Sequence, residues 1–140
     1  WLYNNSAECT NLIRKYKPKT VFNSDYVLLT GQPYRASLDF TKFNIAREFG
    51  NFWALQMMTK NGGELCELTG QENPYPDGKL GVIEEGAYAD LLIVDGNPLE
   101  DIKVIGAREK WFDAEPRDQD IPTIRVIMKD GKFYKNTLGK

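Results

Sequence analysis

The segment from residue 81 to residue 102 constrains the fold most, because turn residues and strand residues alternate there with almost nothing between them. Gly81 and Gly86 bracket a short run that ends in two glutamates, and residues 89–94 form an apolar run of strand length. Four residues of strong turn preference, Asp-Gly-Asn-Pro at 95–98, follow directly. This succession predicts a small β-sheet whose strands are joined by tight turns.

The C-terminal half of the chain is predicted to consist of short strands. Asp130-Gly131 separates two β-prone runs and is a strong hairpin signal, because a type I′ turn needs positive φ angles that aspartate and glycine tolerate. The predicted strands are residues 80–84, 89–95, 123–129 and 132–135.

The N-terminal half is predicted to be largely helical, with helices at residues 7–16, 36–48, 52–60 and 62–69. Asn51 and Asn61 are placed to cap the third and fourth of these helices, since asparagine is a preferred N-cap residue. Gly50 is expected to end the second helix, and Gly70 to adopt the left-handed conformation after the fourth.

One strand is expected within this helical half. Residues 20–25 are a short β-prone run that ends in the carboxylate of Asp25. Residues 31–33, Gly-Gln-Pro, read as part of the loop beyond it, and residues 73–78 read as a second loop because they contain two prolines and a glycine.

Length and composition are compatible with one compact domain or with a fragment of a larger domain. A chain of 140 residues can bury one ordinary core. It opens on Trp1 rather than on methionine, which favours a fragment, and it contains no histidine. The 18 basic residues are scattered among 20 acidic ones, which argues against a nucleic-acid partner. Cys9 and Cys66 are too few and too far apart for a disulfide scaffold or a zinc cluster.

No run approaches the roughly 20 apolar residues that span a bilayer, so no membrane association is expected. The N-terminus lacks basic residues followed by an apolar stretch, so the chain is expected to be cytoplasmic, although a signal peptide preceding Trp1 would fall outside this sequence. The acidic stretch at 111–122 contains Asp113, Asp118 and Asp120, but their spacing is not that of a calcium-binding EF-hand loop, and a solvated loop is favoured.

Three parts of the chain carry a resemblance to a known family. Residues 22–25, Phe-Asn-Ser-Asp, resemble the F-G-[ST]-D end of a barrel strand; Ala54-Leu55 with Thr59 and Asn61 resembles an A-L-x-x-x-T-x-N helix junction; and residues 81–101 resemble a sandwich signature. All three occur in the C-terminal region of the amidohydrolase superfamily, in the imidazolonepropionase-like metal-dependent hydrolases. Asn23 departs from the glycine usual in that family.

The resemblance implies a fold of class α/β plus β: the last strand and helices of a TIM-type amidohydrolase barrel, joined to part of a small β-sandwich. Residues 1–79 would form the end of the barrel, and residues 80–140 the sandwich segment. The implied parent enzyme hydrolyses a carbon–nitrogen bond of a small molecule, of the cyclic amide, N-acyl or dipeptide-like type, and is a candidate homo-oligomer.

The resemblance also implies the site residues. The family counterpart of Asp25 contacts the metal-bound water, acts as general base on it and passes the proton to the leaving nitrogen. A divalent metal, expected to be zinc, would be bound in the full-length parent only, where Asp25 would also be a metal contact. Gln32 and Tyr34 would border the substrate pocket. The family's histidine ligands are absent here, so the 140 residues alone are expected to bind no metal and to be inactive.

Plainer interpretations stay open for each of these residues. Asp25 could be a strand-end carboxylate that caps a turn, and Gln32 and Tyr34 could be ordinary solvated loop residues. Asp90 and Asp95 are interpreted as carboxylates that satisfy backbone donors at turns and strand ends. The alternative function is a non-catalytic binding or assembly module that retains the sandwich. An upstream reading frame carrying an H-x-H motif would favour the enzyme.

Overall fold

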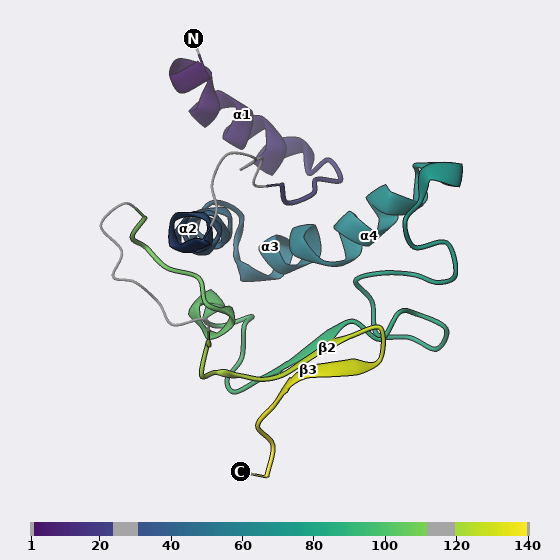
Figure 1. Ribbon diagram of the computed structural model, residues 1–140. Helices are drawn as coiled ribbons and strands as arrows, with labels where there is room; N and C mark the ends of the chain where they lie inside the picture. The colour runs from purple at the N-terminus through teal and green to yellow at the C-terminus, as the bar shows by residue number, and fades with distance from the viewer. Residues whose placement is uncertain (1, 24–30, 112–119, 140) are drawn as a thin grey trace.

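A computed structural model describes residues 2–23, 31–111 and 120–139 of the chain. Helices occupy its first half and a small antiparallel sheet its second half, and the sheet lies on one side of the helices (Figure 1). The elements are α1 (Leu2–Tyr16), α2 (Gly31–Phe49), α3 (Asn51–Met58), α4 (Lys60–Glu67), the 3₁₀ turns η1 (Gly70–Glu72) and η2 (Ile102–Ile105), and the strands β1 (Leu91–Val94), β2 (Ile124–Lys129) and β3 (Lys132–Asn136).

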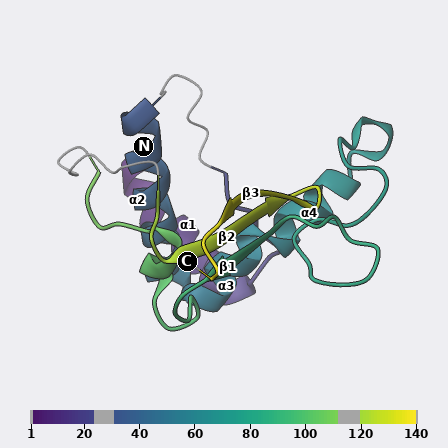
Figure 2. The same cartoon turned by 60° about the horizontal axis from the view of Figure 1, so that its bottom comes forward.

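The three strands form one sheet in the order β1-β2-β3, with both pairs antiparallel. Leu92 pairs with Ile127, and Ile127 pairs with Lys135, so these three side chains share one face of the sheet. Figure 2 shows the sheet from below, with β2 between its two neighbours. The described residues form this one sheet. A β-sandwich requires a second sheet, and the described residues do not form one.

The hairpin turn between β2 and β3 is confirmed. Asp130 has a φ of 49° and Gly131 a φ of 72°, and two successive positive φ values are the requirement of a type I′ turn. This twist matches that of the flanking strands, so the two residues set the register of the hairpin locally.

The strand predicted at residues 80–84 is wrong: these residues have no regular structure. Gly81 has a φ of 73° and packs against the backbone of Thr59, at the junction of α3 and α4. A strand needs a neighbouring strand to complete its backbone hydrogen bonds, and here the run lies against helices instead.

The core is small and lies between α2, α3 and η2. Its buried members are Ala46, Ala54, Ile102 and Ala107, with Phe43, Ile45, Leu55, Met58 and Ile105 packed around them. On β2, Ile124 and Val126 are buried while the residues between and after them are not, as expected of a strand with one covered face. Small alanines allow the helices to approach closely.

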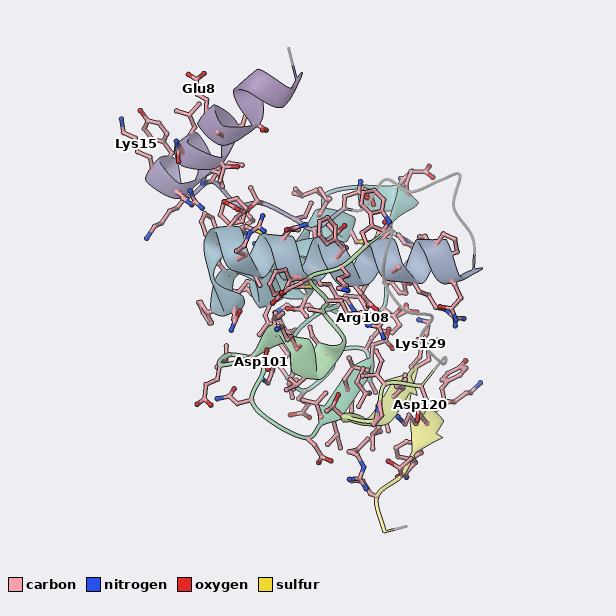
Figure 3. The ribbon with its side chains drawn as sticks, turned by 90° about the vertical axis from the view of Figure 1, so that its left-hand side faces the viewer. Glu8, Lys15, Asp101, Arg108, Asp120 and Lys129 are labelled. Atoms are coloured by element: carbon pink, nitrogen blue, oxygen red, sulfur yellow. The ribbon has the colours of Figure 1, made fainter. Side chains whose placement is uncertain are left out.

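Helix α1 lies at one edge of the molecule, and its side chains Glu8 and Lys15 point away from the other helices (Figure 3). It is held to α2 by Arg14, whose Nη2 lies 2.6 Å from Oε2 of Glu48 and whose Nε donates to the Glu48 carbonyl at 2.9 Å. None of the described helices is both long and apolar enough to cross a membrane.

Two predictions for the region around Asp25 are wrong. Residues 20–23 have no regular structure, because no described strand lies beside them to form a ladder. Residues 31–33 begin helix α2 instead of forming a loop. Pro33 is compatible with this position, since the first turn of a helix contains amide groups that have no intrahelical partner in any case.

The predicted caps at Asn51 and Asn61 are also wrong. The N-cap positions are Gly50 and Thr59, and neither side chain makes a capping hydrogen bond. Both asparagines lie inside the helices and donate to distant backbone carbonyls instead: Asn51 to Leu99 at 3.0 Å, and Asn61 to Thr20 at 2.7 Å. Gly70, in contrast, has the predicted positive φ, of 60°.

Candidate functional site

Of the three predicted site residues, two lie in the part of the chain that the structure describes. Asp25 lies outside the described residues. Gln32 and Tyr34 both lie in the first turn of α2, where Gln32 is exposed and Tyr34 is half-buried. Their predicted contact with substrate stays a prediction.

The backbone that leads to Asp25 is held at two points by the end of α3 and the start of α4. The Phe22 amide donates to the Met57 carbonyl at 3.0 Å, and Nδ2 of Asn61 donates to the Thr20 carbonyl at 2.7 Å. Residues 20–22 are therefore held to the α3–α4 junction through one backbone acceptor, at Thr20, and one backbone donor, at Phe22.

The junction of α3 and α4 presents Asn61 in this direction because Thr59 breaks the helix. Thr59 has a φ of −125° and a ψ of −97°, and its Oγ1 donates to the Leu55 carbonyl at 2.7 Å. The Gly63 amide then donates to the Thr59 carbonyl at 3.0 Å and starts the next helix. The T-x-N spacing places the asparagine two residues beyond the break, so that its side chain reaches the segment at Thr20.

Asn61 is the functional candidate that the sequence interpretation missed. Its side chain is 9% exposed, and its amide reaches across 41 positions of sequence to Thr20. A local signal existed in the A-L-x-x-x-T-x-N pattern, but asparagine near a helix start reads first as a cap. The acceptor that decides its role is distant in sequence and could not be read from the pattern.

An ion pair connects α4 to the same segment. Nζ of Lys19 lies 2.5 Å from Oε2 of Glu64, and this hydrogen bond is the main reason that the pKa of Glu64 is lowered. The charge of Lys60 acts in the same direction at a longer distance, 3.9 Å. Because Lys19 is exposed and Glu64 is only partly covered, the pair is expected to contribute little to the free energy of unfolding.

The carboxylates of Asp90 and Asp95 have structural partners. Oδ1 of Asp90 accepts from the Asp130 amide at 2.7 Å, as the prediction of a backbone-satisfying role requires, and its Oδ2 lies 3.3 Å from Nζ of Lys129. That hydrogen bond raises the pKa of Lys129. Asp90 therefore ties the start of β1 to the hairpin turn.

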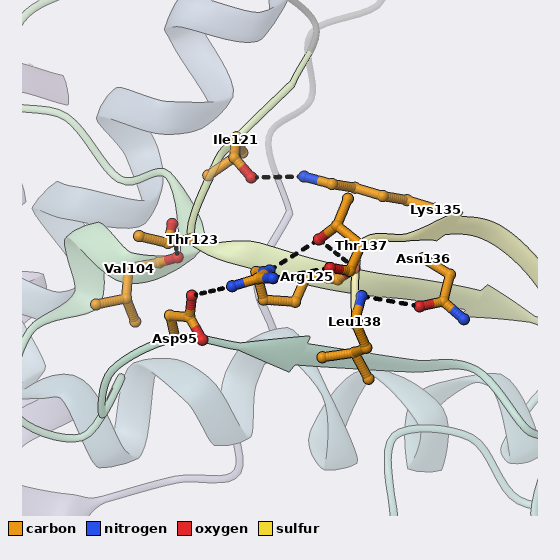
Figure 4. A network of polar contacts seen from close by, with 9 residues as sticks. All are labelled: Asp95, Val104, Ile121, Thr123, Arg125, Lys135, Asn136, Thr137 and Leu138. Atoms are coloured by element: carbon orange, nitrogen blue, oxygen red, sulfur yellow. Dashed lines mark hydrogen bonds and ion pairs between the residues drawn. The ribbon is translucent and has the colours of Figure 1, made fainter. Parts of the chain in front are cut away.

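Asp95 takes part in a network at the other end of the sheet (Figure 4). Its Oδ2 accepts from Nη1 of Arg125 at 2.8 Å, and the same guanidinium donates to Oγ1 and to the carbonyl of Thr137, both at 2.8 Å. The Asp95 carboxylate thus accepts a hydrogen bond from the Arg125 side chain, whereas a backbone donor was predicted. The planar guanidinium joins three segments of the sheet.

No metal site is formed by the residues that are described: no group of three histidine, cysteine, aspartate or glutamate side chains converges in 2–23, 31–111 or 120–139. Cys9 is exposed and Cys66 half-buried, and both are free thiols. In the acidic stretch, the Asp120 carboxylate pairs with Nζ of Lys135, while Asp113 and Asp118 lie outside the described residues.

No family model and no curated protein matches the chain. Two crystal structures do match it: a prolidase complexed with N-methylphosphonate-L-proline, and an uncharacterized protein. The TM-scores are 0.60 and 0.59, the sequence identity is 28% in both cases, and each match covers 92% of this chain. This chain spans 26% of the length of either structure. The chain is therefore similar to one segment of a prolidase, over nearly all of its own length.

Proposed function

We propose that this chain is the C-terminal part of a metal-dependent amidohydrolase that hydrolyses a carbon–nitrogen bond in a small molecule. The observation that carries the proposal is the likeness to a prolidase segment over 92% of the chain at 28% identity. The helix junction is consistent with this proposal, because Asn61 and the Met57 carbonyl hold residues 20–22, which precede the proposed catalytic carboxylate, Asp25, in the sequence.

The part of this chain in the reaction would be proton transfer by Asp25. As a general base, the carboxylate takes a proton from the attacking water while the water oxygen bonds to the carbonyl carbon. As the carbon–nitrogen bond breaks, the same group returns the proton to the leaving nitrogen, so that an acid and an amine are released. A carboxylate suits both steps, since it is ionised at neutral pH and becomes an acid once protonated.

A metal centre would need ligands from outside this chain. The described residues contain no converging set of ligands, and one further carboxylate at Asp25 cannot bind zinc tightly on its own. In the parent, a divalent metal would supply polarisation of the carbonyl and a lowered pKa of water. This chain would add the carboxylate and the backbone support behind it.

The substrate class that we favour is dipeptide-like or N-acyl, in preference to a cyclic amide. The prolidase that resembles this chain was crystallised with N-methylphosphonate-L-proline, in which a tetrahedral phosphorus is attached to a proline nitrogen. A tetrahedral group at that position has the shape of the adduct formed when water attacks an acyl–proline bond. We therefore propose an N-acyl amino acid or a dipeptide as the substrate of the parent.

The test is the hydrolytic activity of the longest protein that is naturally expressed with this chain as part of it. It should hydrolyse dipeptides or N-acyl amino acids, lose activity with a chelator and regain it with a divalent metal. Failure on all C–N substrates by a product that carries the missing histidines would reject the proposal. A product that begins close to Trp1 would favour the non-catalytic module instead.

A further inference from the structure

We propose that an open groove between the end of α1 and the corner where α2 meets α3 is a binding site for a small aromatic carboxylate. The groove has a volume of about 810 Å³, and small-molecule sites usually measure about 300–1,000 Å³. Its lining combines three aromatic side chains with two cationic ones: Phe49, Phe52 and Trp53, and Arg14 and Lys17. The proposal goes beyond the proposed function, because it concerns binding at this groove and would hold for a chain of any activity.

The aromatic side chains form the apolar part of the groove. Gly50, with a φ of 83°, separates α2 from α3, and the end of α2 and the first turn of α3 both line the groove. The rings of Phe49 and Trp53 meet edge to face, with centroids 5.2 Å apart. Phe52 is 64% exposed, which leaves a large apolar ring in water. A planar aromatic ligand would remove this surface from water by stacking on it or by meeting it edge to face.

The charged side chains make the groove positive. Glu48 supplies the carboxylate of the lining, and both of its oxygens are already paired: Oε2 lies 2.6 Å from Nη2 of Arg14, and Oε1 lies 3.3 Å from Nε of Arg47. Lys17 is exposed and forms no ion pair with any residue that the structure describes. The groove thus presents an uncompensated cation in a chain whose net charge is −2. A surface of this kind attracts an anion.

Lys17 is held beside the groove by the end of α1. Its amide donates to the Ile13 carbonyl at 2.8 Å, and it has a φ of 46°. Glycine and asparagine are the residues usual in this left-handed conformation after a helix, because a longer side chain makes it less favourable. Pro18 then restricts the direction of the chain. A lysine thus occupies a position that backbone preference does not favour, and what it adds there is a cation.

A monovalent anion with an apolar body fits this lining best. Phosphate or sulfate would need several charged donors and would gain nothing from the aromatic rings. A neutral aromatic molecule would use the rings but leave Lys17 unpaired. A carboxylate attached to an aromatic ring uses both, with its charge toward Lys17 and its ring against Phe52. Gln56, one turn after Phe52 on α3, lines the same groove and adds an amide that can donate to the second carboxylate oxygen.

The test is isothermal titration calorimetry of the longest protein that is naturally expressed with this chain as part of it, with naphthalene carboxylate as the probe. A ligand of this size should bind with a dissociation constant on the order of 0.1–1 mM. Two analogues separate the contributions: naphthalene methanol keeps the rings without the charge, and acetate keeps the charge without the rings. Naphthalene methanol should bind about tenfold more weakly, and acetate should not approach saturation at about 10 mM.

Two exposed residues of the lining each have a matched control outside the groove. Lys17→Gln should weaken binding of the probe by about threefold to tenfold. Lys15→Gln, at a side chain that points away from the other helices (Figure 3), should leave it within about twofold. Phe52→Ala should weaken binding by about threefold to 20-fold. Phe133→Ala, at a ring that is 59% exposed on β3, should leave it within about twofold. Melting temperatures confirm that each variant is folded.

The outcomes decide both the place and the chemistry of the site. Weaker binding in the two groove variants alone, together with a preference for the charged probe, would support the proposal. Equal binding of naphthalene carboxylate and naphthalene methanol would overturn the assignment of an anion. Equal losses in groove and control variants, or no saturable binding because another part of the protein fills the groove, would overturn the site itself. None of these measurements involves hydrolysis, so the proposed function can fail while this site stands.

Discussion

Gly63 in α4 packs directly against the backbone of Leu80, so that a side chain at Gly63 would stand 2.7 Å from the Leu80 carbonyl carbon. This contact brings the loop before β1 onto the α3–α4 junction. Gly81, the next residue of the loop, lies equally close to Thr59. The loop at residues 80–81 therefore packs backbone against backbone on the α3–α4 junction, a contact that only glycine permits at Gly63 and Gly81.

Replacing Gly63 by alanine should destabilise the protein. The added methyl group overlaps a backbone carbonyl that has no rotamer to change, and overpacking of this type costs about 1–3 kcal/mol. The neighbouring Gly62 is the control, because its added methyl group would meet its nearest neighbour, the Met57 carbonyl oxygen, at 3.9 Å. Gly62→Ala should be neutral or stabilise by up to about 1 kcal/mol through helix propensity. The measurement is the free energy of unfolding of both variants in urea. Equal values for the two variants would contradict the close contact between Gly63 and Leu80.

Replacing Asp25 by asparagine in the complete enzyme should lower turnover by about 100-fold to 10,000-fold, since the shape is retained while the base is removed. Substrate binding should change much less. Asp90→Asn and Asp95→Asn are the controls, because those carboxylates are bonded to the Asp130 amide and to Arg125. The measurement is the steady-state rate of each variant, with its metal content determined. If a control variant lost activity while remaining folded, and Asp25→Asn did not, the general base would have to be another residue.

The ion pair of Glu64 with Lys19 should make stability pH-dependent in acid. The pKa of Glu64 is lowered below its ordinary value of 4.5, so its contribution is present above that pH and is lost as the pH falls through the lowered pKa. Unfolding midpoints of Glu64→Gln and of the unsubstituted protein should differ slightly at pH 7 and converge below pH 4.5. High salt should reduce the difference at pH 7, because Lys19 is exposed and Glu64 is partly exposed to solvent. A difference that persists in strong acid would contradict the assignment.

The type I′ turn should tolerate asparagine but not valine at Gly131. With a φ of 72°, this position costs most L-residues about 1–2 kcal/mol, and a β-branched residue the most. Asparagine enters the left-handed region more readily. Thermal unfolding should therefore rank Gly131→Val below Gly131→Asn, and Gly131→Asn at or slightly below the unsubstituted protein. The reverse order would show that the turn adopts another type.

The isolated 140-residue chain should take up no stoichiometric zinc. It contains no histidine, and the described residues form no converging set of acidic and thiol ligands. Metal analysis after dialysis is the measurement, with the complete enzyme as the positive control. One tightly bound zinc per isolated chain would contradict the proposal that the ligands lie elsewhere.

The sequence was informative about the site only in part. The A-L-x-x-x-T-x-N pattern marked the α3–α4 junction correctly, but Asn61 was predicted to be a cap, and its acceptor at Thr20 is 41 residues away. Asp25, identified by resemblance, falls outside the described residues, so its role stays a prediction. Gln32 and Tyr34 were expected on a loop and lie on a helix.

By itself, the sequence determined what depends on neighbouring residues. The Asp130-Gly131 hairpin, the strand at residues 91–94 and the left-handed Gly70 follow from turn chemistry and backbone preference, which act over a few positions. Tertiary structure alone decided the rest: residues 80–84 and 20–23 have strand-like composition but lie against helices, and two asparagines suited to capping donate to remote carbonyls. The physical reason is that a backbone or amide group takes whichever partner the fold brings within about 3 Å, and that partner is not encoded nearby in the chain.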